Sequence, residues 1–333
     1  MTMLTRSYVM LPVLASASTM SWTAQAGVGP HVSGHATAVD ASGRVFSFGG
    51  LTGSAGSPCE NKLSCFGGDN KWEVLPTKNG PGPRMYAAAA CLGDHFYLLG
   101  GWDPEAPGSG GSFKNEAWRL GLSSLEWEQI ASMPCGPVSR HVACTVGSQV
   151  IVHTFRGVLV LDEPSGTLRQ VQTTGDDPGA LSMSAACALD GETMLLFGGS
   201  TKTQQMTADV WLLDTKTWTW KQLQVRGDQG PSPRASSCAA AAPDGKSAVI
   251  FGGAGIGSGG YEGGAGLTAY SETWRVFVDG MTAKWVKLDA HQAPHARVAA
   301  SLDTLPSGAF LLQGGWDPKS KDTYDAPYIL SLG

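Results

Sequence analysis

The stretch GPGPRMYAAAACLGDHFYLLGG at residues 80–101 decides the fold expected for the rest of this 333-residue chain. It holds a Pro-Arg pair, a run of small residues, a turn, and an apolar run that ends in a glycine doublet. The stretch GPSPRASSCAAAAPDGKSAVIFGG at residues 230–253 has the same plan. Residues 31–50, 136–157, 176–199 and 293–315 repeat it more weakly. Six copies of one unit therefore account for most of the sequence.

The spacing of the glycine doublets gives the period of the repeat. The second glycines are Gly50, Gly101, Gly199, Gly253 and Gly315. The interval of 98 residues between Gly101 and Gly199 is twice 49, so one unit between them lacks the doublet, at residues 150–155. After two of the doublets come tryptophans nine residues apart, Trp118 with Trp127 and Trp211 with Trp220. Short segments rich in aromatic and β-branched residues predict strands, and four of them in a period of about 50 predict one propeller blade.

The glycine doublets and the paired tryptophans make the chain resemble the kelch-repeat family of β-propellers, the galactose oxidase and kelch type, from about Trp22 onward. The resemblance implies an all-β fold, and we expect six blades. The third unit departs most, because Thr154 and Phe155 replace the doublet.

The two ends of the chain are expected to share the last blade. Residues 328–332 make a third strand with no Trp-bearing fourth strand after it, and residues 20–25, which contain Trp22, match that missing strand. An open ring would expose sheet edges that invite aggregation. We therefore predict a single propeller over residues 19–333, closed by its N-terminal strand.

Composition excludes several classes of partner. A net charge of -5, a pI near 5.8 and no cluster of Lys or Arg argue against a nucleic-acid partner or an anionic membrane. No apolar run reaches the roughly 18 residues that a spanning helix needs. Residues 1–18 are predicted to be a leader or a weak targeting segment. The seven cysteines are interpreted mostly as core thiols, and only Cys59 and Cys65 are placed to pair. This pattern favours a reducing compartment, so we expect a cytoplasmic protein, with secretion after cleavage of residues 1–17 as the alternative. We also expect a monomer.

Strand direction predicts which face carries function. In a four-stranded meander, the start of the first strand, the second-to-third loops and the connections between blades all lie on one face, here called the loop face. Its long loops are residues 51–60, 102–114, 200–207, 254–270 and 316–323. Long loops on a rigid scaffold commonly carry binding sites.

Four arginines align at the start of the innermost strands: Arg84, Arg140, Arg234 and Arg297. Guanidinium groups bind carboxylates in a bidentate manner, so this column predicts a pore mouth that binds a protein, an acidic peptide or an anionic small molecule. The alternative is that these arginines bond carbonyl groups of neighbouring blades and hold the ring together.

Tryptophan and histidine complete the expected binding set. A duplicated Gly-Gly-Trp-Asp-Pro segment places Trp102 and Trp316 in the loop face, where they would either anchor a partner or fold back on their own loops. His35 and His295 lie at the starts of two adjacent blades. Each has a second histidine four residues before it, but four extended residues span about 13 Å. We therefore expect no metal, and no cofactor.

The leading hypothesis is a kelch-repeat module for protein–protein interaction through the loop face. The resemblance also implies an alternative, since some kelch-fold proteins are enzymes. A mutarotase-like or specifier-protein-like enzyme would act on an anionic or sugar-derived substrate with Asp103, Glu262 or Asp317 as acid or base. The sequence contains no Gly-x-Ser-x-Gly elbow, so we expect binding rather than catalysis.

Overall fold

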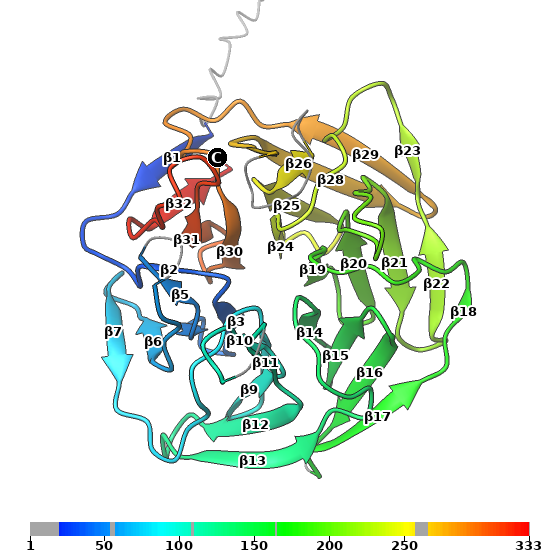
Figure 1. Cartoon of the computed structure of the whole chain (residues 1–333). Coiled ribbons are helices and arrows are strands. Elements are labelled where there is room, and N and C mark those ends of the chain that lie inside the picture. Colours follow the sequence, from blue (N-terminus) through cyan, green and yellow to red (C-terminus); the bar gives the residue numbers. More distant parts are fainter. Residues whose placement is uncertain (1–19, 54–56, 108–109, 164, 257–265, 333) are drawn as a thin grey trace, which may run out of the picture.

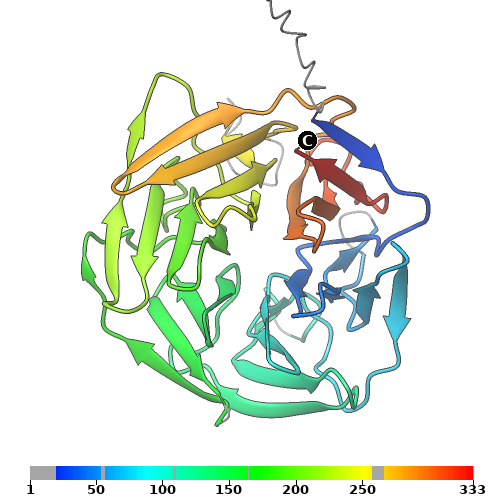
Figure 2. The ribbon, with the colours of Figure 1, turned by 180° about the vertical axis from the view of Figure 1, so that it is seen from behind.

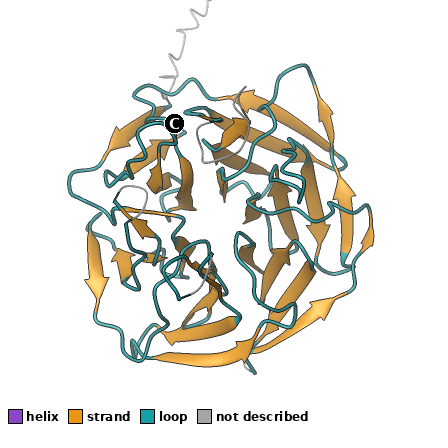
Figure 3. Ribbon diagram, in the orientation of Figure 1, coloured by secondary structure: helices purple, strands orange, loops and turns teal. Residues whose placement is uncertain are grey.

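A ring of six β-sheets surrounds a central axis in the computed structural model, which describes residues 20–53, 57–107, 110–163, 165–256 and 266–332 (Figure 1). The leader expected at residues 1–18 lies outside the described residues. Strands and loops make up this described part, and none of its segments is a helix long and apolar enough to cross a membrane (Figure 3). The prediction of an all-β fold with six blades is confirmed.

Each blade is a four-stranded antiparallel meander that runs from the axis outward. Blade 1 contains β3 (Ala36–Val39), β4 (Val45–Phe48), β6 (Leu63–Phe66) and β7 (Trp72–Leu75). Blade 2 contains β8 (Ala88–Leu92), β9 (His95–Leu99), β12 (Glu116–Gly121) and β13 (Trp127–Ser132). Blade 3 contains β14 (Val142–Val146), β15 (Gln149–Thr154), β16 (Gly157–Asp162) and β17 (Thr167–Val171).

The other three blades repeat this order. Blade 4 contains β19 (Ala185–Ala188), β20 (Thr193–Phe197), β21 (Val210–Asp214) and β22 (Thr219–Gln222), with β18 (Thr174–Gly175) parallel to β22 at its outer edge. Blade 5 contains β24 (Cys238–Ala241), β25 (Ser247–Phe251), β28 (Thr273–Asp279) and β29 (Thr282–Lys287), with β23 (Gln224–Arg226) parallel to β29. Blade 6 contains β30 (Val298–Thr304), β31 (Phe310–Trp316), β32 (Tyr328–Ser331) and β1 (Ser21–Ala24).

Short two-stranded ribbons lie in three loops of the loop face. They pair β2 (Val32–Ser33) with β5 (Leu51–Thr52), β10 (Trp102–Asp103) with β11 (Ser112–Phe113), and β26 (Ala254–Ile256) with β27 (Leu267–Ala269).

The first and last strands close the ring, as the sequence predicts. Strand β1 pairs antiparallel with β32, so that Trp22 lies opposite Leu330 (Figure 2). Trp22 is fully buried, and its ring lies edge-on to that of Phe251 with 5.3 Å between the ring centres. Its Nε1 donates a hydrogen bond to Thr273 Oγ1 at 3.1 Å. Because Phe251 and Thr273 belong to blade 5, this one side chain joins the closing strand to the neighbouring blade.

The glycine doublets are required where one blade meets the next. The first glycine of a doublet has a positive φ, for example +67° at Gly49 and +66° at Gly252. A Cβ atom at Gly49 would lie 2.5 Å from the carbonyl oxygen of Arg84, and one at Gly252 would lie 2.7 Å from that of Arg297. Both carbonyls belong to the following blade, so a side chain there would push neighbouring backbones apart.

Candidate functional site

A central channel runs between the innermost strands. Each blade contributes six consecutive residues to a cavity of about 440 Å³, and most of these residues are small. They are residues 34–39, 86–91, 140–145, 183–188, 236–241 and 299–304.

The first of the six residues in each blade forms a closed ring of backbone hydrogen bonds around the channel mouth. The members of this amide ring all have positive φ: Gly34, Tyr86, Arg140, Met183, Ser236 and Ala299. Each amide nitrogen donates to the carbonyl oxygen of the preceding member at 2.6 to 3.0 Å, and Gly34 completes the circle by donating to Ala299. Five of the six are not glycine, so the surrounding contacts must hold them in a conformation that side chains disfavour.

The prediction that Arg140 aligns with Arg84, Arg234 and Arg297 is wrong. Ala88 pairs with Leu99 directly before the doublet of blade 2, and Val142 pairs with His153 directly before Thr154 in blade 3. Arg140 therefore corresponds to Tyr86, two residues further along than Arg84. Because blade 3 lacks the doublet, the sequence contained no marker for this shift.

The other three arginines are buried beneath their own blades. Arg84 is 2% exposed, and its Nη1 donates to the carbonyl of Gly100 at 3.0 Å and to Glu116 Oε2 at 3.1 Å. Arg234 and Arg297, each 1% exposed, donate in the same way to Gly252 and Gly314. These bonds join each arginine to the doublet of its own blade, not to a neighbouring blade. The structure thus places three members of the expected binding set in the interior.

Ionic contacts hold two of these buried arginines. Arg234 pairs with Glu272 at 2.8 Å, and Arg84 pairs with Glu116. Partial burial raises the pKa of Glu272, but hydrogen bonds from Arg234, Trp274 and Lys287 outweigh it and bring this pKa to about 2. Arg297 contacts an aromatic ring in place of a carboxylate: its guanidinium carbon lies 4.1 Å from the centre of the Tyr324 ring.

Arg140 lies at the channel mouth with two aromatic rings. Its guanidinium carbon is 4.9 Å from the centre of the Tyr86 ring and 5.1 Å from that of Trp102. Trp102 also folds back on its own loop, since its Nε1 donates to the carbonyl of Gly110 at 2.9 Å and its ring stacks on Phe113. The structure therefore brings Arg140 and Trp102 together.

Trp316 and the two histidines lie elsewhere. Trp316 is half-buried in blade 6, where its backbone pairs with Val298. His35 Nε2 lies 3.1 Å from Ser301 Oγ, and burial lowers the pKa of its ring to about 4. His295 is exposed and stacks on Tyr324 with 6.2 Å between ring centres. Among the described residues, no group of three or more His, Cys, Asp or Glu side chains is placed to hold a metal ion.

A second cavity, of about 430 Å³, opens between blades 2, 3 and 4, and the sequence did not predict it. We call it the basic pocket. It is lined by Phe113, Pro137, Val138, Ser139, Arg140, Phe155, Arg156, Ala180, Ser182 and Lys202. Blade 3 turns from β15 to β16 through Phe155 and Arg156 alone, whereas the neighbouring blades carry long loops there. The short turn leaves a hollow framed by Phe113 from blade 2 and Lys202 from blade 4.

Positive charge gathers in the basic pocket around one aromatic ring. The guanidinium carbon of Arg156 lies 4.7 Å from the centre of the Phe155 ring, and the ammonium nitrogen of Lys202 lies 5.6 Å from the same point. Arg156 donates to the carbonyls of Cys135 and Pro137, which orients it without neutralising it. Within the described part of the chain, Arg140, Arg156 and Lys202 have no ion-pair partner. The signal in the sequence was Arg156 in the short turn of the one unit without a doublet.

Known protein families match the same repeats. The model described as the KLHDC2/KLHL20/DRC7 Kelch-repeats domain matches residues 152–332, and the model described as the Kelch motif matches residues 83–134. A solved structure described as "Structure of YjhT" superimposes with a TM-score of 0.66 at 17% identity, covering 89% of this chain and 93% of that one. At this identity the likeness shows the fold alone.

Curated relatives are similar at lower coverage. Kelch domain-containing protein 3 of Bos taurus is 27% identical over 251 residues, which cover 69% of this chain and 63% of that protein. The same protein of Homo sapiens is 26% identical over 204 residues, covering 55% and 51%. Acyl-CoA-binding domain-containing protein 6 of Oryza sativa subsp. japonica is 28% identical over 213 residues, covering 57% and 31%. The chain thus spans less than two thirds of the length of these relatives.

Proposed function

Because this chain belongs to the kelch-repeat family, we propose that it is a binding module that holds an acidic segment of a partner protein in the basic pocket. Kelch propellers share a scaffold rather than one activity, so the proposal depends on the site itself.

The observation that carries the proposal is a set of three cations that form no ion pair with any carboxylate of the described residues: Arg140, Arg156 and Lys202. In a chain of net charge -5, unpaired positive charge gathered around one cavity favours an anionic ligand. Guanidinium forks bind carboxylates through paired hydrogen bonds, and Arg156 is already oriented by two backbone carbonyls.

Aromatic surface beside the cations favours a peptide over a small anion. Phe113 is 49% exposed at the rim, and it stacks on the half-buried Trp102. These rings extend the contact surface beyond the cavity, where apolar side chains next to an acidic residue would pack. A small anion would leave them uncovered.

A peptide-binding experiment tests the proposal. Labelled short peptides rich in Asp and Glu are titrated by fluorescence polarisation, with matched Asn and Gln peptides as the comparison. We expect the acidic peptides to bind, and the triple variant Arg140→Gln, Arg156→Gln, Lys202→Gln to bind at least about tenfold more weakly. Binding should also weaken as salt concentration rises.

The control removes the same charge elsewhere. A variant with Lys221→Gln, Lys246→Gln and Lys284→Gln changes three exposed lysines outside the pocket. Equal loss of affinity in both triple variants would mean that overall charge, not the pocket, attracts the peptide. Undiminished binding by the pocket variant, with an unchanged melting temperature, would refute the proposal.

No observation in the described residues favours the enzyme alternative. Asp103 forms an ion pair with Lys114 at 3.3 Å, and Asp317 accepts a hydrogen bond from the backbone nitrogen of Lys319. Neither lines the basic pocket. Glu262 lies outside the described residues.

A further inference from the structure

The central channel and the basic pocket meet at Arg140. Among the described residues, Arg140 alone lines both cavities. Its guanidinium carbon lies 4.9 Å from the centre of the Tyr86 ring and 5.1 Å from that of the Trp102 ring. Tyr86 lines the channel, whereas Trp102 stacks on Phe113 at the rim of the basic pocket. A ligand bound to this guanidinium group therefore lies beside both cavities.

The side chains at the channel mouth lean toward the preceding blade. A Cβ atom at Gly34 would lie 3.0 Å from the Tyr86 ring, so this ring lies against Gly34 of blade 1. Arg140 holds the corresponding position in blade 3, and it extends over the Tyr86 ring in the same direction. Arg140 is partly exposed, so it is open to a ligand at the mouth. A chain segment that binds Arg140 is thereby placed at the entrance to the channel.

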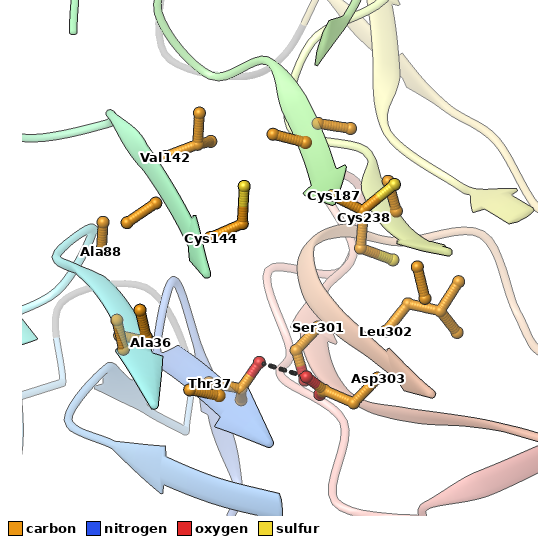
Figure 4. A pocket seen from close by; sticks show the side chains of 18 of the residues that line it. Ala36, Thr37, Ala88, Val142, Cys144, Cys187, Cys238, Ser301, Leu302 and Asp303 are labelled. Atoms are coloured by element: carbon orange, nitrogen blue, oxygen red, sulfur yellow. Dashed lines mark hydrogen bonds between the residues drawn. The ribbon is translucent and has the colours of Figure 1, made fainter. Parts of the chain in front are cut away.

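The channel wall beyond this entrance is largely apolar. Its half-buried side chains include Val142, Ala143, Ala186, Ala239 and Ala300. Val142, which Figure 4 shows on this wall, follows Arg140 by two residues, which span at most about 7 Å. Apolar surface in contact with water favours an apolar group of a ligand.

The histidines and cysteines of the wall are uncharged. Burial lowers the pKa of His35 and of His141 to about 4. Burial also raises the pKa of every thiol of the lining well above neutral pH, at Cys91, Cys144, Cys187 and Cys238. None of these groups attracts an ion into the channel.

The acid of the lining, Asp303, is bonded within the wall. It is 8% exposed, and its Oδ1 accepts a hydrogen bond from Thr37 Oγ1 at 3.1 Å across the junction of blades 6 and 1, as Figure 4 shows. Its Oδ2 is buried. The charge that the channel presents to a ligand is therefore that of Arg140, at the mouth, with apolar surface below it.

We propose that the channel is a second subsite for the same partner segment, in which an aliphatic side chain enters the channel mouth while a neighbouring acidic residue binds in the basic pocket. The inference rests on the proposed function, and it adds a requirement to the partner: one aliphatic residue within about three positions of the acidic residue. In an extended segment, residues two apart are separated by about 7 Å and point to the same side. Because Arg140 borders both cavities, this spacing lets one segment fill both.

The size of the channel allows this occupant. The cavity of about 440 Å³ accommodates a leucine or valine side chain without movement of the strands. A polar side chain of similar length would lose its bonds to water and would meet alanine and valine in exchange. The difference between leucine and glutamine at one peptide position is therefore the property that the experiment measures.

The experiment is a leucine scan of an acidic peptide against the full chain. The parent peptide carries two glutamates in a Gly-Ser background, and both of its ends are capped so that no terminal charge contributes. Leucine, and in a second series glutamine, replaces each position from three before to three after the glutamates. Fluorescence polarisation at about pH 7 should show binding at least about fivefold tighter for leucine at one or two positions, and no gain for glutamine there.

Two channel variants locate the gain. Val142→Thr keeps the shape of the side chain but makes it polar, and Ala186→Val narrows the channel. Each should remove most of the gain from leucine and leave the affinity for the parent peptide within about twofold. Val225→Thr is the matched control, because Val225 is 45% exposed on β23, outside both cavities, and it should change neither affinity. Melting temperatures of all variants confirm that they are folded.

A further variant separates the channel from the rings at the rim. Phe113→Ala removes the exposed ring beside the basic pocket. If this variant abolishes the gain from leucine while both channel variants retain it, the leucine packs on the rim and the channel subsite is refuted. Arg156→Gln should weaken the parent and leucine peptides by the same factor, since it acts on the acidic residue alone.

The two proposals fail by different results. Binding of the parent peptide with no gain from leucine at any position would overturn the channel subsite and leave the basic pocket standing. Equal gains from leucine and glutamine would overturn it as well. Absence of binding by every acidic peptide would refute the proposed function and this inference with it.

Discussion

Replacing Asp303 by asparagine should change the pH dependence of stability in the absence of any ligand. Burial raises the pKa of this carboxyl from 3.8 to about 7 in the folded protein. Since the folded state holds the proton more tightly than the unfolded state, the stabilising contribution is complete below about pH 4 and is lost as pH rises through 7. The amide of the Asp303→Asn variant does not titrate, so the stability of this variant should lack the loss.

The size of the effect follows from the two pKa values. Each pH unit between them changes the free energy of unfolding by about 1.4 kcal/mol. Between about pH 5 and pH 8 the wild type should therefore lose about 3 kcal/mol relative to Asp303→Asn, because about two of these units lie below the folded pKa. Other titrating groups are present in both proteins, so their contributions cancel in the difference.

Urea denaturation over this pH range measures the difference. Asp228→Asn serves as the control, because Asp228 is exposed and its loss should leave the pH profile of the wild type unchanged. A gap between wild type and Asp303→Asn that stays constant with pH would refute the reasoning. So would an Asp303→Asn variant that is less stable than the wild type at about pH 8, since the carboxylate would then be well solvated or paired in the channel.

Two further predictions concern the contacts that join and stabilise the blades. Gly100 and Gly93 both have positive φ, +54° and +59°, but a Cβ at Gly100 would lie 2.5 Å from a backbone carbonyl of the next blade, whereas Gly93 faces open space. Gly93→Ala should cost about 1 kcal/mol from backbone strain and Gly100→Ala about 2 kcal/mol more, and equal costs in urea denaturation would contradict the packing argument. Glu272→Gln should cost about 2 kcal/mol at neutral pH, because it leaves a buried arginine without its counter-charge, while Glu126→Gln in an exposed pair should cost under about 1 kcal/mol. Double-mutant cycles of each glutamate with its partner, Arg234 or Lys78, measure the two interaction energies. Equal energies for the two pairs would contradict the prediction.

The fold was predictable because its requirements repeat within one unit. In five of the six blades the first glycine of the doublet lies where a backbone carbonyl that leads into the next blade comes close, and this requirement appears in the sequence as a glycine pair at a regular interval. The closing strand was predictable for the same reason, since Trp22 matches the fourth strand of the other blades and pairs with β32 in the structure.

The candidate site was predictable only in part. Arg140 and Trp102 were both expected on the loop face, and the structure brings their side chains together. Arg84 was also expected at the pore mouth, because it precedes an innermost strand as Arg140 does. In the structure it is buried, and its side chain bonds the doublet of its own blade and Glu116. The basic pocket was missed because three different blades supply its walls.

The sequence alone determined the repeat, the number of blades and the strand that closes the ring, because backbone conformation and strand burial depend mostly on residues within one unit. Only the tertiary structure decided which charged groups face a cavity. Asp303 meets Thr37 across 266 residues of chain, and Arg140 lies two positions from where the repeat pattern placed it. Such contacts join side chains from different blades, and the closure of the ring determines their distances.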